Sequence, residues 1–155
     1  MSPIAILEAG RLLAERIPQS FLSLIARVAV ANVFWMSGQT KVDGFLHISD
    51  NTFYLFREEY KVPLLPPDLA AYMATTAEHV FPVLLILGLA SRLSALALLG
   101  MTAVIQLFVY PSGWPEHILW ATALFAIIAR GPGTLSLDHL IWRSWTHAPA
   151  YAHSN

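Results

Sequence analysis

Four apolar runs set the pattern of the chain, and they cover residues 20–37, 69–90, 93–110 and 115–130. Each run has roughly 16 to 22 residues, which suits a bilayer core about 30 Å thick, because an α-helix rises about 1.5 Å per residue. The fourth run is the shortest, so its helix is expected to be tilted or to lie partly at the interface. The pattern predicts four transmembrane helices.

Short connections predict how these helices are arranged. Ser91 and Arg92 are almost the whole connection between the second and third runs, which indicates a tight antiparallel hairpin. Residues 111–115 form the next turn, and Pro115 suits a first helical position because its missing N–H needs no partner there. Consecutive helices with short connections favour an up-down bundle. The predicted fold is therefore an all-α membrane protein with four transmembrane helices in an up-down bundle.

The predicted outer loop, residues 38–68, contains a helical pattern of its own. Asp50 is placed to cap a helix that begins at Asn51, and the aromatic side chains that follow share one face: Phe53, Phe56 and Tyr60. Aromatic residues gather where a membrane meets water. An interfacial helix is the favoured interpretation, and a solvated loop is the alternative.

Both ends of the chain contain amphipathic segments. Residues 1–19 predict a helix that lies on the cytoplasmic surface, and residues 136–145 predict a second one. The predicted organisation is a cytoplasmic amphipathic segment at 1–19, a four-helix transmembrane domain at 20–141 and a flexible cytoplasmic tail at 142–155.

The composition indicates which solvent surrounds the protein and excludes several kinds of chemistry. Charged residues make up 12% of the chain, against about 25% in soluble domains, and hydrophobic residues make up 56%. Such a composition indicates lipid as the solvent. The nine Lys and Arg residues and the net charge of −1 give no support for nucleic-acid binding. With no cysteine, this chain alone can form no disulfide, thiolate metal site, iron–sulfur cluster or dithiol redox centre.

Basic residues predict the orientation in the membrane. On the predicted topology, the larger group of basic residues lies on the side of the two termini. Because cytoplasmic loops contain the excess of Lys and Arg, both termini are predicted to be cytoplasmic. The larger group is Arg11, Arg16, Arg92, Arg130 and Arg143, and the smaller is Lys41, Arg57 and Lys61.

Arg27 in the first predicted helix and Glu78 in the second are ionisable residues within the membrane. Each costs roughly 2.5–3.5 kcal/mol on insertion scales, so both are expected to face the bundle interior with partners. Counting residues along the predicted helices places Glu78 at the same depth in the membrane as other polar side chains. The side chain of Arg27 is long enough to reach Glu78. Pro82 has no N–H for the Glu78 carbonyl, so a kink is predicted there. We predict an Arg27–Glu78 ion pair within a buried polar layer that also contains Asn32, His79, Gln106 and His117.

Three interpretations of this layer remain open. Buried polar pairs can serve only to fix helix register, with interhelical hydrogen bonds that average about 0.6 kcal/mol. The layer can instead bind a quinone or another small molecule, or conduct an ion or a proton. His79 and His117 also raise a haem or metal hypothesis, but nothing in the sequence places them face to face, and no haem or metal is predicted.

Several motifs occur together over about residues 20–141. An arginine in the first helix is followed by a Ser-Gly-Gln-Thr-Lys exit, and a glutamate in the second helix leads to a proline, a glycine and an arginine. The ending at residues 131–138 reads Gly-Pro-Gly-Thr-Leu-Ser-Leu-Asp. In this order and spacing, these motifs resemble the DoxX family. The motif positions are Arg27, Gly38, Lys41, Glu78, Pro82, Gly88 and Arg92.

The resemblance implies a four-helix protein of the bacterial inner membrane. The family takes its name from the small subunit of a thiosulfate:quinone oxidoreductase, and some members are linked to membrane oxidoreductase assemblies that handle oxidative stress. Residues 39–45 and 56–67 are similar to a subgroup encoded beside peptide-modifying, metal-stress systems. The motif residues carry over as positions in the pattern, without an assigned catalytic role.

Three functions are compatible with these residues and this resemblance. The first is an accessory or anchor subunit of redox or metal-stress machinery, with a protein partner and a quinone or small-molecule site in the bundle. The second is the membrane subunit of a quinone-reducing, thiosulfate:quinone type oxidoreductase, in which a partner supplies the redox centre. The third is a small-solute transporter, which needs a homo-oligomer because four short helices enclose little volume.

Overall fold

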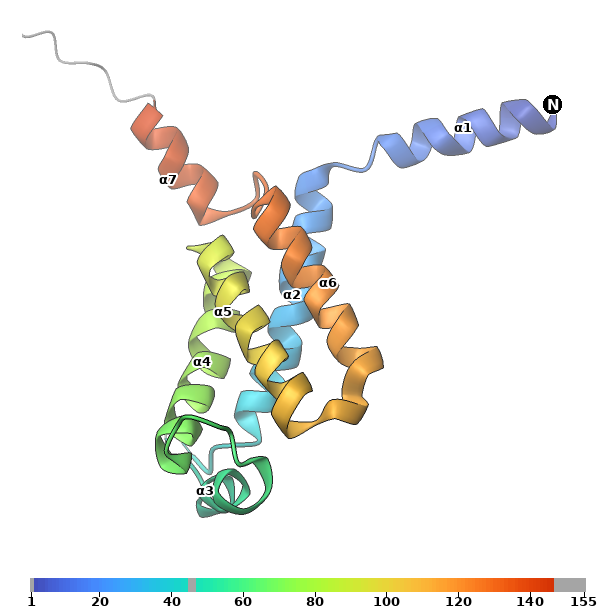
Figure 1. Ribbon diagram of the computed structural model, residues 1–155. Coiled ribbons are helices and arrows are strands. Elements are labelled where there is room, and N and C mark those ends of the chain that lie inside the picture. The colour runs from blue at the N-terminus through green and yellow to red at the C-terminus, as the bar shows by residue number, and fades with distance from the viewer. Residues whose placement is uncertain (1, 45–46, 147–155) are drawn as a thin grey trace, which may run out of the picture.

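Helices form all the regular structure in the described part of the chain, residues 2–44 and 47–146 of a computed structural model (Figure 1). An isolated bridge joins Val42 to Ile48. Residues 142–146 of the predicted tail belong to the last helix, and the rest of that tail lies outside the described residues. The elements are α1 (Pro3–Glu15), α2 (Gln19–Gln39), α3 (Asp50–Leu55), the π-helical η1 (Phe56–Tyr60), α4 (Pro67–Leu87), α5 (Ser91–Val104), the π-helical η2 (Ile105–Val109), the 3-10 turn η3 (Pro111–Gly113), α6 (Trp114–Arg130) and α7 (Leu137–Thr146).

Three helices in the described residues are long and apolar enough to cross a membrane: Gln19–Gln39, Pro67–Leu87 and Ser91–Val109. They agree with the first three predicted runs. α6 has 17 residues, which gives a helix about 25 Å long against a bilayer core of about 30 Å. It packs against α2 and α5 (Figure 1). That α6 is a fourth membrane span stays a prediction.

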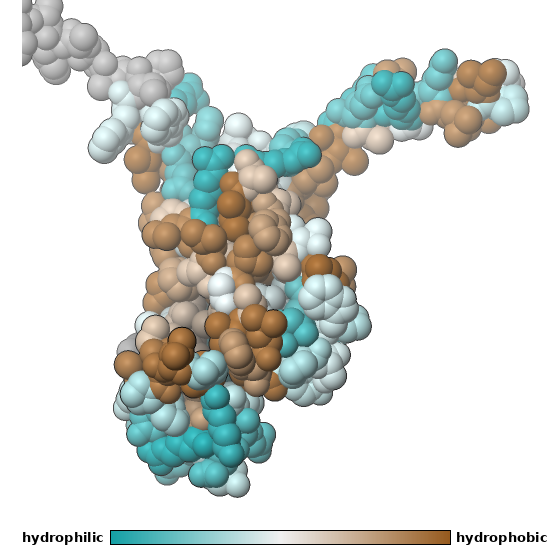
Figure 2. All heavy atoms as spheres, in the orientation of Figure 1, coloured by the Kyte–Doolittle hydropathy of each residue, from teal (hydrophilic) through white to brown (hydrophobic). Residues whose placement is uncertain are grey.

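Apolar side chains fill the interior between α2, α4, α5 and α6, and they also cover the outside. The interior residues are Val30, Ala31, Phe34, Leu85, Ala95, Leu98, Leu124 and Ile127. On the outer faces, Phe21, Leu96 and Phe125 are at least half exposed. Figure 2 shows hydrophobic surface over the middle of the bundle and hydrophilic surface gathered toward its ends. A continuous apolar surface of this kind suits contact with lipid.

The connection between α4 and α5 is as short as predicted, because α4 ends at Leu87 and α5 begins at Ser91. Gly88 has a φ of 69°, in the left-handed region that glycine adopts readily at helix ends. Asp138, in the first turn of α7, closes this turn: its carboxylate accepts hydrogen bonds from the backbone N–H groups of Ala90 at 2.7 Å and Ser91 at 2.9 Å. α7 is thereby attached to the beginning of α5.

The outer loop contains the predicted helix, but its cap and its surroundings differ from the prediction. Ser49, and not Asp50, is the N-cap, because the Ser49 hydroxyl accepts the backbone N–H of Thr52 at 3.2 Å. Asp50 is instead the first helical residue, where its charge is favourable for the helix dipole. Phe56 is buried and forms a second small core with two alanines of α4. α3 and η1 therefore pack on α4 as well as facing the surroundings.

α1 and α7 leave the bundle at the same end, where α2 begins and α6 ends (Figure 1). No residue of α1 is buried. Exposed apolar side chains occur on both helices, including Leu7 and Leu12 on α1 and Leu140 and Trp145 on α7. Such faces suit helices at a membrane surface, as the amphipathic patterns predict.

Candidate functional site

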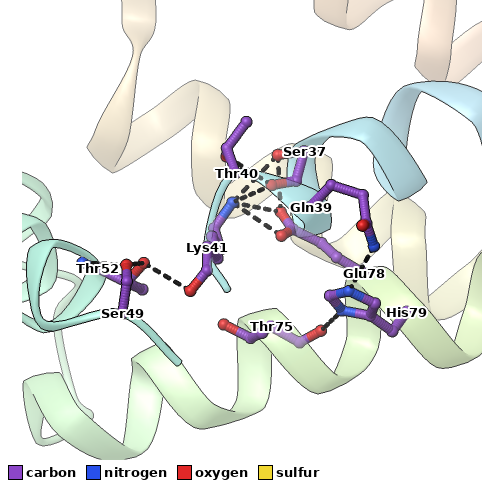
Figure 3. A network of polar contacts seen from close by, with 9 residues as sticks. All are labelled: Ser37, Gln39, Thr40, Lys41, Ser49, Thr52, Thr75, Glu78 and His79. Atoms are coloured by element: carbon purple, nitrogen blue, oxygen red, sulfur yellow. Dashed lines mark hydrogen bonds and ion pairs between the residues drawn. The ribbon is translucent and has the colours of Figure 1, made fainter. Parts of the chain in front are cut away.

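Glu78 and Lys41 form a buried ion pair at the end of the bundle opposite α1 and α7 (Figures 1 and 3). Lys41 Nζ lies 2.8 Å from Glu78 Oε2 and 3.0 Å from Oε1. The two side chains are only 13% and 3% exposed. The Ser37 hydroxyl donates a further hydrogen bond to Oε1 at 3.1 Å. The cation and the hydroxyl together offset the cost of removing the carboxylate from water.

Lys41 is held through its side chain and through its backbone (Figure 3). Its ammonium group donates to the Ser37 carbonyl oxygen at 3.3 Å, near the C-terminal end of α2, where the helix dipole favours a cation. Its own carbonyl oxygen accepts hydrogen bonds from the Ser49 backbone N–H and from the Thr52 hydroxyl, each at 3.0 Å. The outer-loop helix therefore fixes the backbone of the residue that pairs with Glu78.

Gly38 lets α2 and α4 approach closely beside the ion pair. A Cβ atom at this position would lie 2.9 Å from Cε1 of His79 and 3.1 Å from Cβ of Glu78. Both distances are shorter than an ordinary van der Waals contact between carbon atoms. A larger residue would therefore push α4 away from the end of α2, and Glu78 away from Lys41.

A second polar pair joins α6 to the π-helical η2. Gln106 Nε2 donates to the Pro111 carbonyl oxygen at 2.8 Å, so the Oε1 atom of the same amide is the one that contacts His117 Nδ1, at 2.7 Å. Nδ1 therefore donates, and Nε2 of the ring has no hydrogen-bond partner in the described part of the chain. Trp120 packs against the imidazole, with ring centroids 4.8 Å apart. Single π-helical turns are frequent at functional sites.

A cavity of about 540 Å³ lies between the helices, and members of both polar pairs line it. Lys41 and Glu78 border it from the end of α2 and from α4, and His117 borders it from α6. The rest of the wall is mainly aromatic or aliphatic and includes Phe34, Phe56, Tyr60, Phe81, Met101 and Trp120. A largely apolar cavity with a few polar groups is typical of small-molecule sites.

Tyr60 lines this cavity from η1, in the outer loop. Burial raises the pKa of the Tyr60 phenol, and the charges of Glu59 and Glu78 raise it further. The phenol therefore keeps its proton at neutral pH and is a hydrogen-bond donor.

Arg27 does not pair with Glu78, so the predicted ion pair is wrong. Its guanidinium donates instead to the backbone carbonyl oxygens of Leu85, at 3.0 Å, and of Leu135, in the loop before α7. Gly88 leaves room for it, since a Cβ atom there would lie 2.3 Å from Arg27 Nη1. The Leu85 carbonyl oxygen also accepts the Gly88 backbone N–H at 3.1 Å, and it can take both donors because a carbonyl oxygen has two lone pairs.

The other members of the predicted layer do not form one cluster either. Asn32 is exposed on α2. His79 is half-buried and is not part of the cavity wall. Its Nδ1 atom contacts the Thr75 carbonyl oxygen at 2.7 Å, and its Nε2 atom contacts Gln39 Nε2 at 3.0 Å (Figure 3). Both ring nitrogens are thus engaged. Within the described ranges, no group of three or more His, Cys, Asp or Glu side chains is placed to hold a metal ion.

Pro82 and Arg92, the remaining motif positions, lie away from the cavity wall. Pro82 is buried in α4, which continues past it to Leu87, and the kink stays a prediction. Arg92 Nε donates to the Ile128 carbonyl oxygen at 3.1 Å and so links α5 to α6. The motif residues therefore gather at two ends of the bundle, with Gly38, Lys41 and Glu78 at one and Arg27, Gly88 and Arg92 at the other.

The sequence predictions include Lys41 as a motif position but not as the partner of Glu78. No local signal gives this pairing, because α2 ends at Gln39 and Lys41 lies just past its end. For Tyr60 and Trp120 there is no signal either, because aromatic residues of a membrane protein commonly face lipid or fill the core.

Comparison with known proteins shows the family of the chain. The DoxX family model matches residues 22–111, a range that includes Lys41, Glu78 and Gln106. A protein of Haemophilus influenzae, described as uncharacterized, is 31% identical over 128 residues, which cover 76% of this chain and 82% of that protein. No solved structure matches the chain. Because the family model covers more than half of its residues, the chain belongs to the DoxX family.

Proposed function

We propose that the protein is an integral membrane subunit that binds a quinone in the bundle cavity and serves as an accessory or anchor in a redox or metal-stress assembly. In this proposal α6 is a fourth transmembrane helix in an up-down bundle of the bacterial inner membrane, and both termini are cytoplasmic. The observation that carries the proposal is the cavity, where a buried ion pair and a histidine border an aromatic and aliphatic wall.

The donors and acceptors around the cavity match a quinone headgroup. Quinone carbonyl oxygens only accept hydrogen bonds, and the Tyr60 phenol and the Lys41 ammonium are donors. Lys41 would exchange its long 3.3 Å contact with the Ser37 carbonyl oxygen for a contact with the headgroup. The reduced form has O–H groups, which His117 Nε2 would accept in the tautomer that has its proton on Nδ1. A bound quinone would supply two-electron redox chemistry, while these residues bind and orient it.

The assembly role rests on composition and on the elements outside the bundle. Because the chain has no cysteine, a thiol or iron–sulfur redox centre would have to belong to a partner. α1 and α7 at one end and α3 at the other offer surfaces for such a partner. If the partner oxidises a sulfur compound, the same cavity would be the quinone site of a thiosulfate:quinone type enzyme.

Quinone binding is tested with the full-length protein in detergent micelles, with decylubiquinone as the probe and tryptophan fluorescence as the readout. Trp120 lines the cavity, so binding should quench fluorescence in a saturable way, and less so in Trp120→Phe. The double variant Lys41→Gln/Glu78→Gln removes both charges and keeps polar side chains. It should weaken binding about tenfold or more, because hydrogen bonds to charged groups contribute about 1.5–3 kcal/mol.

His79→Gln is the matched control, since His79 follows Glu78 in α4 but does not line the cavity. Its affinity should equal that of the wild type. If quenching does not saturate, or if the double variant binds as tightly as His79→Gln, the polar residues serve only to hold the helices together and the quinone site is rejected.

The assembly role has a separate test. Crosslinking in native membranes, followed by affinity capture of the tagged chain, should recover an oxidoreductase subunit or the product of a neighbouring gene in comparable amounts. Recovery of this chain alone would contradict the accessory role, whatever the outcome of the quinone titration.

A further inference from the structure

A groove with a volume of about 860 Å³ lies at the end of the bundle opposite the Lys41–Glu78 pair. The beginning of α5, the end of α6 with the loop that follows it, and α7 form its walls (Figure 1). Arg92 and Arg130 contribute two positive charges, and Leu93, Ile141 and Trp145 contribute apolar surface. This combination differs from that of the bundle cavity, where a carboxylate balances the cation.

Both arginines are oriented by neutral hydrogen-bond acceptors. Arg92 Nε donates to the Ile128 carbonyl oxygen, and its guanidinium lies against Gly131, where a Cβ atom would be 3.3 Å from Nη2. Arg130 Nη1 donates to Gln19 Oε1 at 3.0 Å. Neither guanidinium forms an ion pair with a carboxylate in the described ranges. Each therefore has N–H groups left for an anion.

The acidic side chain in the groove wall, Asp138, offsets only one of these two positive charges. Both oxygens of Asp138 accept backbone N–H groups at the beginning of α5, so this carboxylate is engaged in capping that helix. With two arginines against one capping carboxylate, the groove has a positive excess and is complementary to an anion.

The position of the groove identifies the kind of anion. It lies where the membrane-length helix α2 begins, α4 ends and α5 begins, which is the depth of the lipid headgroups. Exposed Leu140 and Trp145 on α7 suit the boundary between headgroups and acyl chains. We propose that the groove binds the phosphate of an anionic phospholipid through Arg92 and Arg130, with the acyl chains along the apolar side chains of α5 and α7. This binding is independent of a quinone in the bundle cavity.

The proposal is tested by native mass spectrometry of the full-length protein in detergent, titrated with dioleoylphosphatidylglycerol or dioleoylphosphatidylcholine. The anionic lipid should bind about tenfold tighter or more, since each arginine near a membrane surface contributes on the order of 1 kcal/mol. Arg130→Gln should weaken binding of the anionic lipid about fivefold, and Arg92→Gln/Arg130→Gln should abolish the preference. Arg130→Gln leaves the Arg92–Ile128 hydrogen bond intact, so it keeps the test decisive if the double variant does not fold.

Arg11→Gln/Arg16→Gln is the matched control, because it removes the same charge at the same end of the molecule but outside the groove. It should change the affinity less than twofold. Equal affinity for the two lipids, or an equal loss in the control, would overturn the proposal. Competition by free glycerol phosphate at the concentration of the lipid would also overturn it, because the groove would then be a site for a soluble anion.

Discussion

Glu78 is buried together with Lys41, so the two residues should contribute to the stability of the protein as a pair. Lys41→Met leaves a buried carboxylate without its counter-charge and should destabilise the protein by about 3–5 kcal/mol. A second substitution, Glu78→Gln, should recover most of that loss because no unpaired charge then remains. Unfolding in mixed micelles measures both free energies. If the double variant is no more stable than Lys41→Met, the pair does not form.

Gly38 on α2 and Gly100 on α5 offer a matched comparison of two helical glycines. Gly38→Ala places a methyl group 2.9 Å from the His79 ring and should destabilise the protein by about 1–3 kcal/mol. Gly100→Ala meets nothing within 4 Å and should be neutral or stabilising by up to about 1 kcal/mol, owing to the higher helix propensity of alanine. The same unfolding measurement applies. Equal effects at the two positions would mean that α2 and α4 are not in close contact at Gly38.

His47 makes the outer loop sensitive to pH. The Asp43 carboxylate is hydrogen-bonded to the His47 ring and raises its pKa, and the charge of Asp50 adds to the effect. Because the folded-state pKa lies above the unfolded value of about 6.5, the contact stabilises the loop fully below that value and is lost as the pH rises through the folded pKa. Asp43→Asn should lower the pKa of His47 in an NMR titration of the ring. An unchanged pKa would exclude the contact.

At the scale of elements, the α4–α5 turn depends on a residue that lies far along the chain. Asp138→Ala removes the acceptors for the backbone N–H groups of Ala90 and Ser91 and should destabilise the protein by about 0.5–2 kcal/mol, as loss of a helix cap does. Hydrogen exchange of these two amides should accelerate, while the amides of α6 keep their wild-type protection. Unchanged exchange at Ala90 and Ser91 would show that α7 is not attached there.

The elements that sequence predicts well are those whose signal is local. A run of apolar residues of membrane length is sufficient for the helices Gln19–Gln39, Pro67–Leu87 and Ser91–Val109. The π-helical turn at Ile105–Val109 has no such signal, because the turn that follows it and the Gln106–His117 contact form only in the folded bundle.

In the candidate site, sequence gives the depth of a residue in the membrane but not the direction in which its side chain points. Counting residues gives the depth of Asn32 in the membrane, but the face that it occupies depends on how α2 packs, and it is exposed. Arg27 could not be paired correctly from residue types, because its acceptors are backbone carbonyl groups and every residue has one. The pairing of Lys41 with Glu78 cannot be predicted from the apolar run, because Lys41 lies beyond the end of the run and of α2.

At the scale of the whole molecule, the absence of native cysteine makes the topology directly measurable. Single cysteines at Ser2, Asn51 and Ser144 can be labelled with a membrane-impermeant maleimide. With four spans, Ser2→Cys and Ser144→Cys should react only from the cytoplasmic side, and Asn51→Cys only from the opposite side. If α6 does not cross, Ser144→Cys should react from the same side as Asn51→Cys, so this position decides the number of spans.

The two hydrogen bonds from Ser49 and Thr52 to the Lys41 carbonyl oxygen have a mechanical consequence. α2 ends at Gln39, and Lys41 lies just past it. Its N–H donates to the Gly38 carbonyl oxygen at 3.0 Å, while its own carbonyl oxygen accepts these two bonds from the outer-loop helix. A displacement of α3 is thus transmitted directly to the cation of the cavity, while the carboxylate stays with α4. A partner that binds the outer loop and displaces α3 would therefore change the distance between Lys41 Nζ and the Glu78 carboxylate.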